Sequence, residues 1–213
     1  MYQLHYYPAN ASAAAHMVLE EMGADYELML VDRTIDAQKS KDYLKINPNG
    51  RIPTLVDGNL VLFEAAAIVL HLLDQNPQTG LAPKLGTPER STFNQWLIFL
   101  TNSLQEELMI YQYPDRLTGN DTKATEVVRR GAEARASTYL DVIEQHLGTN
   151  GPLFLGTTLS AVDFYFVMLC RWARPMTNPP RSRPTIAKLL DRITALPSVR
   201  RAYEGEGITD EIS

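Results

Sequence analysis

Hydrophobic positions in the first 76 residues alternate between short runs typical of strands and longer stretches with helical spacing. Gly23 is placed to end the first helix, and Asp57-Gly58, between two short apolar runs, predicts a tight hairpin. The pattern predicts strands at Tyr2–Tyr6, Tyr26–Val31, Thr54–Val56 and Leu60–Leu62, and helices at Ala11–Met22, Gln38–Leu44 and Ala65–Leu73. This order, βαβ followed by ββα, predicts an α/β domain over residues 1–76.

The remainder of the chain is helical wherever its hydrophobic positions are periodic. The stretch from Gln75 to Pro88 is interrupted by prolines and glycines and has no periodicity, so residues 77–88 are expected to form a linker. Beyond it the pattern predicts helices at Glu89–Tyr111, Thr122–Leu147, Ala161–Ala173 and Thr185–Leu196, with a short last helix after Pro197. Residues 89–213 are therefore expected to form an all-α helical-bundle domain.

The composition is that of an ordinary globular protein. The chain has 213 residues, of which 45% are hydrophobic and 21% charged, and this length can bury a core without a disulfide or a metal. Its one cysteine, Cys170, has no partner for an internal disulfide, which suits a reducing compartment. No apolar run approaches the ~18 residues of a membrane-spanning helix, and the first residues lack a secretory signal. These features predict a cytoplasmic protein with no membrane partner.

The formal charge of −5 comes from the first 76 residues, which contain 5 Lys+Arg against 10 Asp+Glu. No dense basic stripe is present, so a nucleic-acid partner is not expected. A basic cluster surrounds a proline-rich stretch and is interpreted as solvated arginines of a loop rather than as a phosphate-binding patch. Its members are Arg171, Arg174, Arg181 and Arg183.

Two positions in the α/β region each allow two interpretations. In Arg51-Ile52-Pro53-Thr54 the proline either is trans and begins an edge strand, or is cis and turns the Ile52 backbone toward an extended ligand. Glu64, where a strand turns into a helix, either caps that helix or binds the ammonium group of a ligand. Residue type alone favours the trans proline and the capping role.

Polar side chains also gather where the first strand leads into the first helix, at Tyr6, Tyr7, Asn10 and Ser12. Their hydroxyl and amide groups can hydrogen-bond a thiolate, and a helix dipole lowers the pKa of a thiol at such a position. Capping of the helix by Asn10 or Ser12 is the alternative. No metal site is expected, because the histidines lack the spacing of metal ligands; they are His5, His16, His71 and His146.

These segments, in this order, resemble the glutathione transferase family. The opening YYPANASAAAHMVLEEMGADYEL resembles the bacterial, beta-like branch, and KSKDYLKINPNGRIPTLVDGNLVLFEAAAIVLHLLD resembles the rest of the glutathione-binding domain. Ser160 and Asp163, in LSAVD, resemble the family's capping box at the start of a central helix. The resemblance implies a thioredoxin-like N-terminal domain, a helical C-terminal domain and a homodimer. It also implies glutathione as co-substrate and no other cofactor.

The resemblance assigns roles to individual residues. Ile52 and Pro53 match the family's cis-proline loop, whose backbone clamps the cysteinyl unit of glutathione. Glu64 matches the ligand of the γ-glutamyl group, with the backbone N–H of Ala65 beside it. The glycine carboxylate of glutathione is expected to contact Lys39 and Gln38, with Arg51 as a further polar candidate.

Three departures from the family pattern change the expected chemistry. Ala65 replaces the usual Ser that donates to the γ-glutamyl carboxylate, and Ala11 replaces the beta-class cysteine, so no mixed disulfide can form there. Gln105 and Glu106 stand where the beta class has His and Lys. The thiolate is therefore expected to depend on Ser12, Asn10 or Tyr6, with the pair at the helix start preferred over Tyr6.

The second substrate is expected between the domains, against aromatic side chains of the helical domain. The candidates for this acceptor wall are Phe99, Tyr111, Tyr113 and Trp172. The predicted function is conjugation of the glutathione thiolate to a small, apolar electrophile. The alternatives are a non-catalytic glutathione-binding or regulatory relative, and a peroxidase or isomerase that uses the same thiolate.

Overall fold

The computed structural model describes residues 1–209, which form two compact units. The first unit comprises Met1–Ala82 together with the chain from Ile193 to the last described residues, and the second comprises Pro83–Arg192. The predicted domains, residues 1–76 and 89–213 with a linker at 77–88, differ from this grouping at the C-terminus. The reason is that the last helix packs against the first one. The domain bounds stay a prediction.

A four-stranded sheet forms the centre of the first unit, in the order β2-β1-β3-β4. Strand β1 (Tyr2–Tyr6) is parallel to β2 (Tyr26–Leu30), whereas β3 (Thr54–Asp57) is antiparallel to both β1 and β4 (Leu60–Phe63). Asp57 pairs with Leu60, so Gly58 and Asn59 make the hairpin turn, and Gly58 has φ +59°. The predicted thioredoxin-like order of elements is confirmed.

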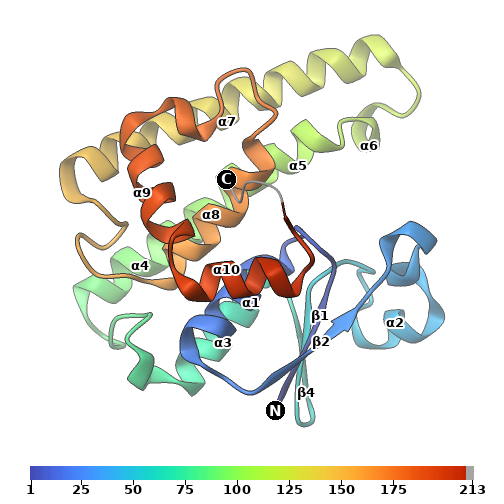
Figure 1. Ribbon diagram of the computed structural model, residues 1–213. Coiled ribbons are helices and arrows are strands. Elements are labelled where there is room, and N and C mark those ends of the chain that lie inside the picture. The colour runs from blue at the N-terminus through green and yellow to red at the C-terminus, as the bar shows by residue number, and fades with distance from the viewer. Residues whose placement is uncertain (210–213) are drawn as a thin grey trace. The chain divides into compact units, whose positions relative to one another are not determined.

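Helices lie on both sides of this sheet (Figure 1). Helices α1 (Ser12–Met22) and α3 (Ala65–Gln75) pack against each other, and α2 (Lys41–Ile46) lies on the other side of the strands. The first turns of α1 bury small side chains, Ala13, Ala14 and Ala15, which allow close packing. Helix α1 ends at Gly23, with φ +63°, as predicted. Helix α10 (Pro197–Gly205) packs on α1, and short 3₁₀ turns lie at Arg33–Ile35, Ala37–Lys39 and Pro77–Thr79.

The second unit is helical throughout its regular elements. They are α4 (Pro88–Phe99), α5 (Glu106–Gln112), α6 (Asp115–Thr118), α7 (Thr122–Asn150), α8 (Ala161–Ala173), a 3₁₀ turn at Pro180–Ser182 and most of α9 (Pro184–Thr194). The predicted single helix over Glu89–Tyr111 is wrong in one respect, because a π-helical stretch at Leu100–Gln105 separates α4 from α5. Helix α8 is the centre of this unit, since all of its residues except Trp172 are buried.

A capping box fixes the start of α8, as the sequence predicts. Asp163 is fully buried, and one of its carboxylate oxygens accepts hydrogen bonds from the Ser160 N–H and hydroxyl at 2.9 and 3.0 Å. The other oxygen accepts the Phe154 N–H at 3.1 Å, which fastens the preceding loop to the helix. Burial raises the pKa of Asp163 to about 6, against the opposing effect of these hydrogen bonds.

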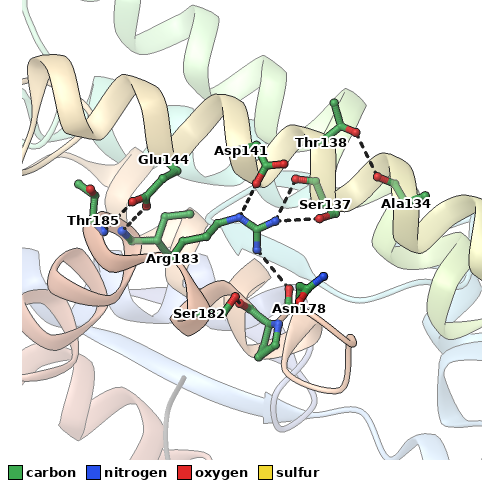
Figure 2. Close-up of polar contacts among 11 residues, drawn as sticks. Ala134, Ser137, Thr138, Asp141, Glu144, Asn178, Ser182, Arg183 and Thr185 are labelled. Atoms are coloured by element: carbon green, nitrogen blue, oxygen red, sulfur yellow. Dashed lines mark hydrogen bonds and ion pairs between the residues drawn. The ribbon is translucent and has the colours of Figure 1, made fainter.

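The interpretation of the basic cluster as solvated arginines is wrong for Arg171 and Arg183, which are buried. Figure 2 shows the Arg183 guanidinium directed at α7, where its Nε donates to Asp141 at 2.8 Å. Its other nitrogens donate to the carbonyl oxygen and hydroxyl of Ser137 and to the carbonyl oxygen of Asn178. Arg183 is buried because one planar group satisfies acceptors on both a helix and a loop.

Neither a membrane-spanning helix nor a metal-binding cluster occurs among the described residues. No helix in residues 1–209 is long and apolar enough to cross a bilayer. No group of three or more His, Cys, Asp or Glu side chains in this part of the chain is arranged to hold a metal ion.

Cys170 is fully enclosed, and burial raises the pKa of its thiol well above the ordinary value, which makes it an unreactive thiol.

Candidate functional site

The turn between β1 and α1 carries the first group of predicted site residues. Ala9 has φ +57°, a left-handed conformation that is unfavourable for a residue with a Cβ. The next residue, Asn10, uses its Oδ1 to accept the Ala11 N–H at 2.8 Å. The cap position of α1 is Ala11, with no side-chain cap hydrogen bond, so the alternative in which Asn10 or Ser12 caps the helix is wrong. The amide nitrogen of Asn10 has no hydrogen-bond partner within residues 1–209.

Ser12 and Tyr6, the other two candidates for the thiolate, have different surroundings. Ser12 is fully buried, and its hydroxyl donates to the Tyr7 carbonyl oxygen at 3.3 Å. Burial raises the pKa of Tyr6, and the Glu206 carboxylate raises it further. Tyr6 therefore stays protonated at neutral pH and keeps its hydroxyl hydrogen. Within residues 1–209, the Asn10 amide and the Tyr6 hydroxyl have no hydrogen-bond partner, whereas the Ser12 hydroxyl is already engaged.

The loop before β3 contains a cis peptide bond between Ile52 and Pro53. The cis alternative is confirmed. The preceding carbonyl, that of Arg51, accepts hydrogen bonds from the Tyr43 hydroxyl at 2.7 Å and the Asn47 amide at 2.8 Å. The Ile52 N–H and C=O, in contrast, have no partner within residues 1–209. The loop is thus fixed through the Arg51 carbonyl and leaves one backbone donor and one acceptor of Ile52 unpaired. An extended peptide can form hydrogen bonds with both.

Glu64 connects β4 to α3 in a conformation that few non-glycine residues adopt. Its φ is +74° and its ψ is 113°, its side chain is exposed, and it makes no cap hydrogen bond. The simple capping interpretation of Glu64 is therefore wrong. Ala65, the first residue of α3, is buried, and this first turn has no acidic side chain. The helix start thus has unpaired backbone N–H groups and a favourable dipole for a carboxylate.

Gln38 and Lys39 lie against the cis-proline loop. The Lys39 ammonium is 3.4 Å from the Asn49 carbonyl oxygen, and a Cβ on Gly50 would come within 2.9 Å of the Gln38 carbonyl oxygen. The Gln38 amide nitrogen donates to Asp36 at 3.0 Å, while its Oε1 is buried without a partner in the described chain. An unsatisfied buried acceptor is costly, and a ligand donor can remove that cost.

Within residues 1–209, the non-glycine residues with positive φ are Ala9, Asp36 and Glu64. Each precedes a predicted glutathione residue by one or two positions: Asn10, Gln38 and Ala65 respectively. Such conformations persist only where the surrounding structure enforces them, and they cluster at functional sites. The backbone of the first unit is therefore unusual at three of the predicted contact points.

The four aromatic candidates for the acceptor wall do not lie together. Phe99 packs edge-to-face against Trp96 and Tyr139, at the end of α4. Tyr111 is buried, and its hydroxyl donates to the Pro175 carbonyl oxygen at 2.9 Å. The two remaining candidates are close to Tyr111. Tyr113 directly follows α5, the helix that contains Tyr111, and the Trp172 carbonyl oxygen accepts a hydrogen bond from Gln112 at 2.8 Å.

Sequence reasoning missed Glu206 and gave His16 no role at the site. His16 Nδ1 lies 3.0 Å from the Glu206 carboxylate, and both side chains are buried. A second oxygen of Glu206 accepts the Ala9 N–H at 2.9 Å. The residues in this pair are 190 positions apart, so no local pattern points to it. Gln105, in the position of the beta-class His, accepts a hydrogen bond from the Tyr165 hydroxyl at 2.6 Å.

Comparison with known proteins matches both parts of the chain. Residues 2–74 match the family "Glutathione S-transferase, N-terminal domain", and residues 107–204 match "Glutathione S-transferase, C-terminal domain". Among characterised sequences, the chain is 31% identical over 191 residues to glutathione S-transferase 3 of Zea mays. That alignment covers 86% of this chain and 84% of the relative.

Solved structures extend the likeness over nearly the whole chain. A glutathione transferase from Methylococcus capsulatus is 30% identical, with a TM-score of 0.85 and coverage of 98% of this chain and 100% of the other. A sphingomonad glutathione S-transferase in complex with glutathione is 26% identical, with a TM-score of 0.84. Its alignment covers 97% of this chain and 100% of the relative.

Proposed function

Because this chain belongs to the glutathione S-transferase family, we propose that three segments of its first unit bind reduced glutathione: the β1–α1 turn, the region from Asp36 to Pro53, and the β4–α3 junction. The protein is a glutathione S-transferase, an enzyme that conjugates the thiolate of glutathione to an electrophile. The observation that carries the proposed binding mode is the unpaired Ile52 backbone beside the cis bond to Pro53. This backbone pairs with the cysteinyl unit, as one strand pairs with another.

The γ-glutamyl end of glutathione carries both an ammonium and a carboxylate. We assign the ammonium to the exposed Glu64 carboxylate and the carboxylate to the first turn of α3, beginning with the Ala65 N–H. Ala65 supplies no hydroxyl, so one hydrogen bond is absent relative to a Ser at this position. A loss of this kind costs about 1 kcal/mol, which weakens binding without abolishing it.

The glycine end of glutathione carries the second carboxylate. We assign it to Lys39 and Arg51, both exposed and both adjoining the cis-proline loop. We assign Gln38 to the same part of the site. Its Oε1 is a buried acceptor, which gains a partner if a glutathione N–H reaches it. Bound glutathione would then be held at both ends, which fixes its sulfur near the start of α1.

The chemical step requires a thiolate. The glutathione thiol loses its proton to solvent, and the sulfur uses its lone pair to form a bond with the electrophile, whose leaving group departs with the bonding electrons. We assign stabilisation of the thiolate to Asn10, Ser12 and Tyr6, with the α1 dipole adding to their hydrogen bonds. Asn10 is favoured over Ser12 because its amide donors are not engaged within residues 1–209, and over Tyr6 because it lies at the start of α1, where the helix dipole adds to the hydrogen bond. Glutathione is a co-substrate in this reaction, and no step requires another cofactor.

For the electrophile we propose contacts with Tyr111, Tyr113 and Trp172, since acceptor pockets are mostly aromatic and aliphatic. Phe99 remains a candidate, although its ring already packs between Trp96 and Tyr139. An apolar acceptor follows from the character of these side chains. Cytoplasmic location is part of the same proposal, because Cys170 is the one cysteine and is buried as a free thiol.

We also propose that the enzyme is a homodimer. Strand β4 is one of the two edge strands of the sheet, and its Leu60, Val61 and Phe63 side chains are exposed. Unpaired apolar edge strands promote association, so natural proteins cover them. A second copy of the chain would cover this edge. Sedimentation of the wild type beside a Val61→Lys variant tests it, and a wild type that sediments as a monomer would contradict it.

A calorimetric titration with reduced glutathione, followed by turnover assays with a panel of electrophiles, tests the proposed function. We expect binding and formation of a thioether product. Binding without turnover of any electrophile would favour the non-catalytic alternative, and turnover of peroxides alone would favour a peroxidase. Absence of glutathione binding would contradict the assignment of the three segments.

A further inference from the structure

Glu206, the residue directly after α10, is a buried carboxylate whose two oxygens have different partners. Its relative exposure is 5%, and its Oε1 lies 3.0 Å from the Nδ1 of His16 on α1. Its Oε2 accepts the backbone N–H of Ala9 at 2.9 Å. A buried carboxylate needs such partners, because an unpaired charge away from water is strongly unfavourable.

The hydrogen bond between the Ala9 N–H and Glu206 involves the residue of the β1–α1 turn that has a left-handed backbone conformation. Ala9 has φ +57°, so the turn needs a contact that favours this conformation over the ordinary ones. A charged acceptor makes a shorter and stronger hydrogen bond to a backbone N–H than a neutral one. The residues that follow Ala9 are Asn10 and Ser12, which we assign to the thiolate.

A series of hydrogen-bonded side chains connects Glu206 to Arg201 of α10. His16 Nε2 lies 2.9 Å from the Tyr26 hydroxyl, and this hydroxyl donates to Glu20. The other oxygen of Glu20 accepts from Arg201 of α10 at 2.6 Å. The helix also approaches the ring itself, since a Cβ on Gly205 would lie 3.4 Å from His16 Cε1. The network thus closes on itself, and it fixes the position of His16 and of the carboxylate that His16 contacts.

We propose that Glu206 is a positioning residue for the glutathione thiolate: it holds Ala9 in the left-handed conformation that places the Asn10 amide beside the sulfur. The inference rests on the proposed function. It makes the last helical turn of the chain part of the apparatus that ionises glutathione, although Glu206 itself is not assigned a contact with glutathione. The network of His16, Tyr26 and Glu20 supports the carboxylate from behind.

The central experiment compares substitutions of Glu206 that remove or keep the acceptor. Glu206→Leu is apolar and removes the carboxylate that accepts the Ala9 N–H, whereas Glu206→Gln keeps an oxygen for Ala9 and can donate to His16. Glu204→Gln is the matched control, because Glu204 is exposed near the end of α10, two residues before Glu206. Ultraviolet titration of the bound thiolate, kcat and KM for glutathione, and thermal melting are measured for each variant.

For Glu206→Leu we expect the pH at which bound glutathione ionises to rise by about one unit, which lowers kcat near neutral pH about tenfold. KM for glutathione should change far less, because its γ-glutamyl and glycine ends are held elsewhere. Glu206→Gln should recover most of the wild-type value, and Glu204→Gln should match it. Equal effects of the Leu and Gln variants, or an unchanged ionisation in folded Glu206→Leu, would overturn the inference.

Hydrogen exchange of the turn separates this inference from the proposed function. Without glutathione, the segment around Ala9 and Asn10 should exchange faster in Glu206→Leu than in the wild type or Glu204→Gln. If the wild type binds no glutathione, the proposed function fails, while the exchange result still decides whether Glu206 holds the turn. Unchanged exchange in a protein that binds glutathione would overturn the positioning role alone.

Tyr26→Phe serves if Glu206→Leu does not fold. It keeps the ring and removes only the hydroxyl between His16 and Glu20. We expect thiolate ionisation and hydrogen exchange to change in the same direction as in Glu206→Leu. The effect should be smaller, with kcat near neutral pH lowered about threefold. Wild-type values for both measurements would overturn the role of the network.

Discussion

Buried polar side chains have different surroundings in the two units of this glutathione S-transferase. In the second unit, Asp163 and Arg183 satisfy a helix start, a loop carbonyl and a facing helix. In the first unit, Glu206 satisfies the N–H of Ala9, a residue in an unfavourable backbone conformation beside candidate site residues. Within residues 1–209, all non-glycine residues with positive φ lie in the first unit.

The difference separates two uses of a buried polar group. A group that completes helix ends and loops stabilises the fold, and its loss should lower stability while glutathione binding is retained. A group that enforces an unfavourable conformation beside a ligand uses folding free energy to present binding groups. Its loss should affect the ligand chemistry more than the melting temperature. Stability and glutathione chemistry, measured on the same variant, therefore distinguish the two uses.

The largest expected effect is on stability, for Arg183→Met. The guanidinium is 9% exposed and donates to Asp141, Ser137 and Asn178, so its removal leaves several acceptors unpaired. We expect a loss of about 3 kcal/mol in the free energy of unfolding, measured in urea, with unchanged glutathione affinity. Arg181→Met is the control, because that ion pair with Asp191 is 40% and 68% exposed and is worth about 1 kcal/mol or less. Equal losses would contradict the prediction.

Glu64→Gln should have the largest effect on binding. The exposed carboxylate makes no cap hydrogen bond, so the folded protein loses little, whereas glutathione loses a charge-assisted contact. We expect the dissociation constant to rise roughly 30-fold, equivalent to about 2 kcal/mol, with melting unchanged. Calorimetry measures the first and a thermal scan the second, beside an exposed control, Glu27→Gln. A fall in stability with intact affinity would restore the capping role.

Thiolate ionisation provides the next test, within the first unit. Asn10→Ala removes donors that are free in the structure, and Ser12→Ala removes a hydroxyl already bonded to Tyr7. We expect the pH of ionisation of bound glutathione to rise by about 1–2 units for Asn10→Ala and by less for Ser12→Ala. Tyr6→Phe should have the smallest effect. Ultraviolet titration of the three variants decides the order, and a large shift for Tyr6→Phe alone would show that Tyr6 is the main donor.

Much of the fold could be predicted from sequence because its signals are local. The hairpin depends on Gly58, the end of α1 on Gly23, and the capping box on Ser160 and Asp163, three residues apart. The cis bond before Pro53 required the family resemblance, since residue type alone favours trans. Local patterning therefore accounts for the elements, and the resemblance for the candidate site.

The missed features depend on contacts between distant residues. Glu206 and His16 lie 190 positions apart, and neither occurs in a motif. The burial of Arg183 depends on acceptors that α7 supplies more than 40 positions earlier. The π-helical stretch at Leu100–Gln105 keeps the apolar spacing of a helix, so periodicity does not reveal it. Tertiary partners, not local propensity, decide the first two cases.

The smallest expected effect is the pH dependence that Asp163 gives to the second unit. Burial raises the pKa of Asp163 from 3.8 to about 6, so the folded protein binds a proton that the unfolded chain has already lost in this range. A raised pKa in the folded state means that stability is greatest below the unfolded value and falls as the pH rises through the folded value. Between about pH 5 and pH 6 this amounts to about 1 kcal/mol. Asp163→Asn cannot titrate, so the stability advantage of the wild type over this variant should shrink by that amount. Urea unfolding of both proteins at the two pH values measures it, and a constant difference would show that the capping hydrogen bonds keep the pKa near its ordinary value.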